Sequence, residues 1–190
     1  MRDGKMATRG LSGMVLLLYP FIVYVGLTYG GWPLLGVVIL ILAALRLVLY
    51  RARLKTASLV APPAAAAIAL AGLALLSGAP DFLLYYPVAV SAAMLALFST
   101  SLRYPPTVIE RLARLRHPDL PPSGVLWTRK VTIVWCLFFV ANGAIALGTI
   151  QSGDLELWTL YNGMISYIAM GTLVVGEIVA RRIVMGPVAI

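Results

Sequence analysis

The chain has 190 residues, of which 61% are hydrophobic and 12% are charged, and its mean hydropathy is +0.94. Soluble domains use about 45 to 50% apolar residues, so this composition excludes a water-soluble globule. The net charge of +8 comes from bases that flank apolar segments, as membrane topology requires, and we therefore expect no nucleic-acid partner.

The apolar residues come in blocks of about twenty, the length that a helix needs to cross a hydrocarbon layer about 30 Å thick. In chain order, the blocks predict six transmembrane helices, at about 11–29, 33–50, 57–77, 82–102, 131–150 and 158–180. One longer connection, 103–130, separates the fourth and fifth helices. The sequence thus predicts an all-α, polytopic membrane helix bundle that forms a single transmembrane domain over 1–190.

The basic residues predict the orientation, because Lys and Arg are retained on cytoplasmic flanks during insertion. With the N-terminus inside, all fifteen Lys and Arg lie on the cytoplasmic side, and the outer connections carry only the acids Asp81, Asp154 and Glu156. Both termini are therefore expected to be cytoplasmic.

Two short segments, Leu17-Leu18-Tyr19-Pro20 and Leu84-Tyr85-Tyr86-Pro87, resemble each other. Three predicted crossings separate them, so they would run in opposite directions, as in the inverted repeats of secondary transporters. Chance similarity within a Leu-rich and Tyr-rich sequence is the alternative.

Two charged residues lie at membrane depth near the predicted inner face, Arg46 and Glu177. A charge inside a bilayer costs several kcal/mol unless it is paired or hydrated. We expect Glu177 to form a structural ion pair, with Arg181 on the same helix or with Arg46 across the bundle. A proton-coupled or substrate-contacting carboxylate is the alternative.

Two asparagines, Asn142 and Asn162, also lie within predicted transmembrane helices. Lipid cannot satisfy their donors and acceptors, so interhelical hydrogen bonds are expected. A ligand or ion path lined by Asn142, Asn162 and Tyr167 is the alternative.

The cytoplasmic connection contains Thr107-Val108-Ile109-Glu110, a capping box that predicts a helix start. The following turns form an amphipathic helix with Val108, Ile109, Leu112 and Leu115 on one side and Glu110, Arg111 and Arg114 on the other. We expect this helix to lie on the inner leaflet against anionic lipid, with docking of an acidic partner as the alternative. The candidate docking or lipid-surface residues are Arg111, Arg114, Arg116, Arg129 and Lys130.

The chain contains one cysteine, Cys136, and one histidine, His117. Zinc sites, haem sites and Cys/His nucleophile sites need more cysteines and histidines than this chain contains. We expect no metal, no cofactor and no catalytic residue, which favours a non-enzymatic role without excluding an enzyme.

Several segments between about 104 and 177 carry a family resemblance: 105–115, 118–122, 128–132, Trp135-Cys136, Phe138-Phe139, Asn142-Gly143, Tyr161-Asn162-Gly163 and Gly176-Glu177. They resemble an uncharacterised family of bacterial inner-membrane proteins that is often encoded among aryl-polyene-type fatty acid and polyketide synthesis genes. The resemblance implies a multi-pass protein of the bacterial inner membrane. It also implies an acidic acyl carrier protein or lipid-synthesis enzymes as partners of the basic segment.

Two functions therefore compete. The favoured one is a non-catalytic membrane accessory that anchors or organises cytoplasmic lipid or aryl-polyene-type synthesis machinery through residues 103–130. The alternative is a small transporter or flippase for a lipid-like product, with a path built on Asn142, Asn162 and Glu177. The sequence leaves the oligomeric state open.

Overall fold

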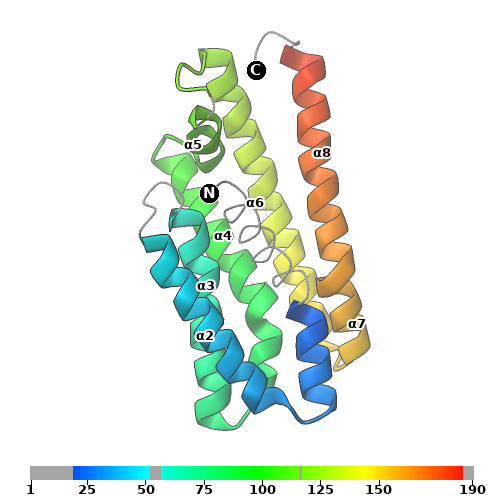
Figure 1. Ribbon diagram of the computed structural model, residues 1–190. Helices are drawn as coiled ribbons and strands as arrows, with labels where there is room; N and C mark the ends of the chain where they lie inside the picture. Colours follow the sequence, from blue (N-terminus) through cyan, green and yellow to red (C-terminus); the bar gives the residue numbers. More distant parts are fainter. Residues whose placement is uncertain (1–18, 52–56, 116, 186–190) are drawn as a thin grey trace, which may run out of the picture.

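The computed structural model describes residues 19–51, 57–115 and 117–185, with the backbone alone for 46–51, 57–60 and 185. The described residues form helices and no strand (Figure 1). In chain order the helices are Tyr19–Thr28, α2 (Trp32–Arg51), α3 (Ala57–Ser77), the 3-10 helix η1 (Pro80–Tyr85), α4 (Tyr86–Arg103), α5 (Val108–Arg114), α6 (Pro122–Gln151), α7 (Leu155–Leu160), the π-helical turn η2 (Tyr161–Ile165) and α8 (Ser166–Met185).

Three continuous helical stretches are long and apolar enough to cross a membrane, namely Pro80–Arg103, Pro122–Gln151 and Leu155–Val184. Three shorter apolar helices accompany them, Tyr19–Thr28, Trp32–Leu45 and Ala61–Ser77. The predicted all-helical architecture is thus confirmed for the described residues, and three of its helical stretches have the length and composition of membrane spans. The number of six crossings stays a prediction, and residues 11–18 of the first predicted helix lie outside the described residues.

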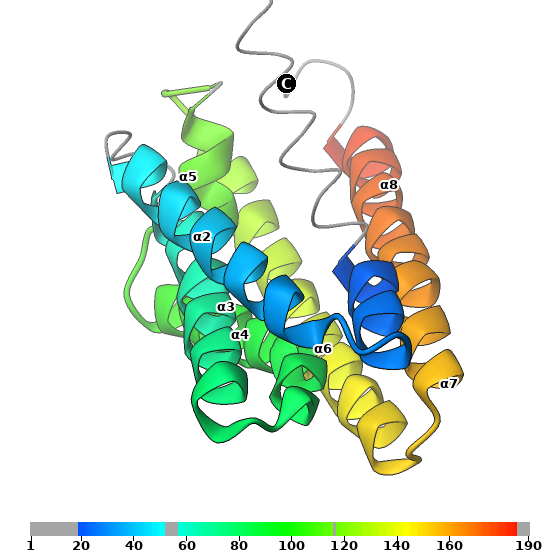
Figure 2. The same ribbon diagram turned by 60° about the horizontal axis from the view of Figure 1, so that its bottom comes forward.

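Successive long helices run in opposite directions, and the helix ends that carry basic residues lie at the same end of the bundle. Figure 1 places the C-terminal ends of α2, α4 and α8 and the N-terminal end of α6 at one end of the bundle, here called the basic end. By sequence these ends carry Arg51, Arg103, Lys130 and Arg182. The turn before α2, η1 and α7 lie at the opposite end, which Figure 2 turns toward the viewer.

Two clusters of buried side chains hold the bundle together. At the end opposite the basic end, Trp158 and Leu83 are almost fully buried with Val23, and the small residues Ala71 and Ala74 let α3 approach them. The second cluster joins α4, α5 and α6 through Phe98, Val108 and Phe139. By contrast, α8 makes few contacts with the other described elements, and most of its side chains are exposed.

Two predicted boundaries are corrected near prolines. The helix predicted at 82–102 begins as a 3-10 helix at Pro80, and its α-helical part starts at Tyr86, where Pro87 occupies the first turn. Proline is tolerated at a helix start because its missing N–H would be unpaired there anyway. The helix predicted at 158–180 begins at Leu155, where the Asp154 carboxylate accepts from two free backbone N–H groups, and the helical stretch continues to Met185.

The largest correction concerns α6, which begins at Pro122 rather than at residue 131. The prediction located the end of the apolar run, at Arg129 and Lys130. Charged residues end the lipid-facing stretch but are good helix formers, so the helix continues past them to Pro122. The predicted cytoplasmic connection 103–130 is therefore shortened to residues 104–121.

Candidate functional site

Asn142 joins three elements of the bundle. Its Nδ2 donates to Oγ of Ser91 on α4 at 3.1 Å, and its Oδ1 accepts from the hydroxyl of Tyr161 in η2 at 3.1 Å. Beside it, a Cβ on Gly143 would lie 3.1 Å from Cβ of Ser91, so α4 and α6 approach closely at this level. Asn142 thus makes the interhelical hydrogen bonds expected from its depth.

Asn162 joins η2 to α6 and is 3% exposed. Its Nδ2 donates to the carbonyl of Trp158 at 2.9 Å and, at 3.4 Å, to Oγ1 of Thr149 on α6. Its Oδ1 has no hydrogen-bond partner among the described residues. Interchanging the amide oxygen and nitrogen would set two acceptors against each other at Trp158, so the Nδ2 assignment is the favourable one.

Tyr19, from the first of the two similar tetrapeptides, lies beside residues of the second and of η1. Its ring lies against that of Tyr86, with 4.5 Å between centroids, and its hydroxyl donates to the carbonyl of Leu83 at 2.7 Å. The contact shows that Tyr19 and Tyr86 are neighbours, whereas Leu17 and Leu18 lie outside the described residues and the inverted repeat stays a prediction.

A groove of about 650 Å³ lies between α6 and α8. We call it the lateral groove. Its α6 wall consists of Trp127, Lys130, Val131, Val134, Trp135 and Phe138, and its α8 wall of Ala169, Thr172, Leu173, Gly176, Glu177 and Ala180. Neither Asn142, Asn162 nor Tyr167 lines it, so the structure does not bring the predicted polar residues together in one site.

The charged lining residues gather at the basic end of the lateral groove. Because α6 and α8 run in opposite directions, Trp127 and Lys130 near the start of α6 lie level with Glu177 near the end of α8. The indole Nε1 of Trp127 donates to Oε1 of Glu177 at 3.1 Å. The rest of the wall is apolar except for Thr172, so the groove is amphipathic along its length.

The partner of Glu177 was missed by reasoning from the sequence, which considered bases alone. The neutral indole of Trp127 is its observed hydrogen-bond partner. The side chain of Arg46 lies outside the described residues, so an ion pair between Arg46 and Glu177 stays a prediction. The sequence did hold one indication of this contact, namely the similar membrane depth of the two residues. A Trp at the interface and a Glu one turn inside the same face can meet across antiparallel helices.

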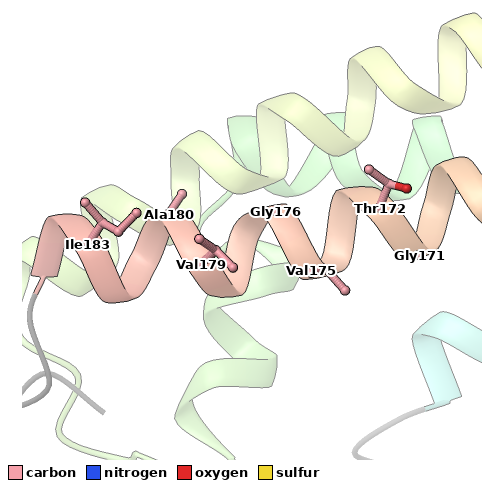
Figure 3. A pocket seen from close by; sticks show the side chains of 7 residues that line it. All are labelled: Gly171, Thr172, Val175, Gly176, Val179, Ala180 and Ile183. Atoms are coloured by element: carbon pink, nitrogen blue, oxygen red, sulfur yellow. The ribbon is translucent and has the colours of Figure 1, made fainter.

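Small residues on α8 leave space beside the lateral groove. Thr172, Gly176 and Ala180 recur every fourth residue, and they also border a shallow hollow on the outer face of α8. In Figure 3, Thr172 and Ala180 point toward the neighbouring helix and Val175 points away from it. A Cβ added at Gly171 or Gly176 would have no atom within 4 Å, so both positions can accept a larger side chain.

The predicted capping box does begin a helix, α5. The Thr107 hydroxyl accepts from the backbone N–H of Glu110 at 3.2 Å, and Oγ of Ser101 on α4 accepts from the N–H of Val108 at 3.1 Å. The predicted faces are corrected, because Glu110 is buried whereas Leu112 is exposed. The reason is that α5 packs against α4 and α6 through its first turn, and Glu110 is paired there with Arg114 at 2.8 Å.

The predicted basic docking residues are largely engaged with backbone carbonyls. Arg111 donates to the carbonyl of Pro106 at 2.8 Å, Arg114 to that of Pro118 at 3.0 Å, and Arg129 to that of Leu102 at 3.1 Å. Arg116 lies outside the described residues, and Lys130 lines the lateral groove. These arginines therefore hold the 104–121 connection in place, in addition to any binding role.

Comparisons of the chain with protein-family models, with curated proteins and with solved structures find no match. The resemblance to inner-membrane proteins of aryl-polyene-type gene clusters therefore stays a prediction.

Proposed function

We propose that the protein is a multi-pass accessory of the bacterial inner membrane that holds the apolar chain of a lipid-like molecule in the lateral groove. The supporting observation is a groove of about 650 Å³ whose charged lining residues, Lys130 and Glu177, both lie at one end. Ligand sites commonly have volumes of about 300 to 1,000 Å³ and mostly apolar walls with few polar groups. In this proposal the protein serves lipid or aryl-polyene-type synthesis without catalysing a reaction.

The walls of the groove suit a flexible hydrocarbon chain. The α6 wall contains the aromatic residues Trp135 and Phe138, and the α8 wall contains the small residues Ala169 and Gly176, so one side is aromatic and the other leaves space. An amphiphile lying here would place its headgroup beside Trp127, and Trp side chains favour the headgroup level of a bilayer. The bound molecule would then keep the depth that it has in the surrounding lipid.

This geometry gives less support to a transport path through the asparagines. Asn142 is bonded to Ser91 and Tyr161, and Asn162 is bonded to Trp158 and Thr149. Transport would have to break these hydrogen bonds, whereas the described residues of α6 and α8 leave the lateral groove between them as they stand. We therefore favour holding of a lipid-like molecule over its translocation.

The proposal is tested by filling the groove. Gly176→Leu would place a side chain in the open space of the groove, and Gly171→Leu would place the same side chain on α8 outside it. Native mass spectrometry of the purified protein, incubated with phospholipid, should show bound lipid for wild type and for Gly171→Leu, and much less for Gly176→Leu. Equal lipid binding by all three proteins, each folded by circular dichroism, would refute the proposal.

Docking of an acidic partner at the basic end is a second candidate. Arg103, Arg111 and Arg129 are exposed there, and an acyl carrier protein is acidic enough to be attracted by them. Because Arg111 and Arg129 also bond backbone carbonyls, charge reversal would disturb the connection as well. The sharper test is a pull-down from solubilised membranes with Arg103→Glu combined with Arg182→Glu, which should lose carrier protein that wild type recovers. Undiminished recovery would argue against docking.

A further inference from the structure

We propose that the basic end of the lateral groove selects a zwitterionic phosphoethanolamine-type headgroup, with the phosphate at Lys130 and the ammonium at Glu177. This inference rests on the proposed function, because it concerns the headgroup of a molecule whose apolar chain fills the same groove. It begins from the fact that two opposite charges line one end of an otherwise apolar site.

Lys130 and Glu177 do not neutralise each other. The ion pair between described residues is Arg114–Glu110, elsewhere in the molecule, and no salt bridge joins Lys130 to Glu177 within residues 117–185. The Lys130 side chain is exposed, and its ammonium is a compact point charge of the kind that binds phosphate. The same end of the groove therefore offers a ligand both a cation and an anion.

Trp127 orients the Glu177 carboxylate without cancelling its charge. The indole N–H is a neutral donor, and it occupies Oε1 at 3.1 Å. A carboxylate has about four acceptor positions on its two oxygens, so Oε2 is left to accept from a ligand. Arg181, one turn further along α8, does not line the groove.

The chemistry of the two groups distinguishes among common headgroups. A primary ammonium can donate charge-assisted hydrogen bonds to Glu177, which are about twice as strong as neutral ones. A quaternary ammonium has no N–H to donate. A headgroup with a phosphate and no amine offers Glu177 no hydrogen-bond donor of opposite charge and brings a second negative charge near it. We therefore expect a phosphoethanolamine lipid to bind about tenfold more tightly than a phosphoglycerol lipid with the same chains.

The test uses the full chain in detergent with an equimolar mixture of phosphatidylethanolamine, phosphatidylglycerol and phosphatidylcholine that carry identical acyl chains. Native mass spectrometry reports which lipid is bound. Wild type should carry mainly phosphatidylethanolamine. Glu177→Gln keeps an acceptor for Trp127 and should lose the preference, and Lys130→Gln should lower the binding of all three lipids. Arg182→Gln, an exposed base on α8 outside the groove, is the control and should behave as wild type.

The outcomes separate this inference from the proposed function. If lipid binds and Gly176→Leu blocks it, but the three headgroups bind equally or phosphatidylglycerol is preferred, the headgroup assignment is overturned and the groove function stands. If Glu177→Gln keeps the wild-type preference, the assignment is likewise overturned. If Gly176→Leu leaves lipid binding unchanged, the groove function itself fails.

Discussion

Asn142 shows how a single polar side chain fastens membrane helices. Both ends of its amide are bonded to other elements, to Ser91 on α4 and to Tyr161 in η2. Lipid offers no replacement partner for any of these groups. We therefore expect Asn142 to contribute to the free energy of unfolding through these two hydrogen bonds.

Asn142→Leu should lower the free energy of unfolding by about 1 to 3 kcal/mol, since each interhelical hydrogen bond in a membrane protein contributes roughly 0.6 to 2 kcal/mol. Unfolding in mixed detergent micelles measures the change. Val140→Leu, at an exposed position of the same helix, is the control and should have little effect. A variant as stable as wild type would mean that Ser91 and Tyr161 find other partners.

Gly143 is the residue at which the close approach of α4 and α6 can be tested. A Cβ at this position would lie 3.1 Å from Cβ of Ser91, whereas a Cβ at Gly148 on the same helix would meet nothing within 4 Å. Gly143→Ala should therefore destabilise the protein by about 1 to 3 kcal/mol through overpacking. Gly148→Ala should be neutral or slightly stabilising, because alanine is the better helix former. Comparing the two melting temperatures checks this expectation, and a Gly143→Ala protein at least as stable as the Gly148→Ala protein would contradict it.

At the scale of elements, α5 depends on caps at its first turn. Thr107 accepts from the N–H of Glu110, and Ser101 accepts from the N–H of Val108. Without them, these buried N–H groups would be unpaired. The short helix has seven residues, too few to be stable without such support.

Thr107→Ala should destabilise α5 by about 0.5 to 2 kcal/mol. The measurement is limited trypsin digestion of the detergent-solubilised protein, in which cleavage after Arg111 and Arg114 should become faster. Thr100→Ala is the matched control, since the Thr100 hydroxyl bonds carbonyls of its own helix and is exposed. Equal cleavage rates for both variants would show that Thr107 is dispensable for α5.

In α6, the apolar run and the helix begin at different residues. Hydropathy located the part of the helix that lipid can surround, but the helix itself begins nine residues earlier, at Pro122. Burial in lipid and hydrogen bonding along the backbone are different requirements. Arg129 and Lys130 are too polar to be surrounded by lipid, but their backbone continues the helix. The capping box at Thr107 was predictable because the pattern is local in the chain.

The lateral groove could not be predicted in the same way. Its polar end depends on Trp127 meeting Glu177, fifty residues later, and thus on the relative position of α6 and α8. Hydropathy and spacing determine which residues are at membrane depth but not which helices are neighbours. The interhelical role of Asn142 was foreseeable, whereas the identities of Ser91 and Tyr161 as its partners were not.

At the scale of the whole molecule, the clearest expectation is the orientation in the membrane. The ends of α2, α4 and α8 and the start of α6 share the basic end (Figure 1), and cytoplasmic flanks retain Lys and Arg. Single cysteines at Asp119 and at Glu156, both exposed, would report the two ends once Cys136 is replaced by alanine.

A membrane-impermeant maleimide added to cells with a permeabilised outer membrane should label Glu156→Cys and leave Asp119→Cys unlabelled until the inner membrane is opened. Labelling of the Cys136→Ala protein without an added cysteine sets the background. The opposite pattern would invert the orientation, and with it the proposed cytoplasmic position of the basic end.

The bond between Arg129 and the carbonyl of Leu102 has a further consequence, because it fixes the level of the basic end relative to both α4 and α6. From Arg129 to Gln151, α6 rises about 33 Å at about 1.5 Å per residue. That length matches the hydrocarbon thickness of an ordinary bilayer, about 30 Å. Sliding of the two helices past each other to suit a thinner membrane would break this hydrogen bond. Tilting of the whole bundle or deformation of the lipid, at a cost of fractions of a kcal/mol per Å, keeps it and is the favoured response to hydrophobic mismatch. The thickness of the surrounding bilayer is thereby coupled to how the mouth of the lateral groove meets the headgroups.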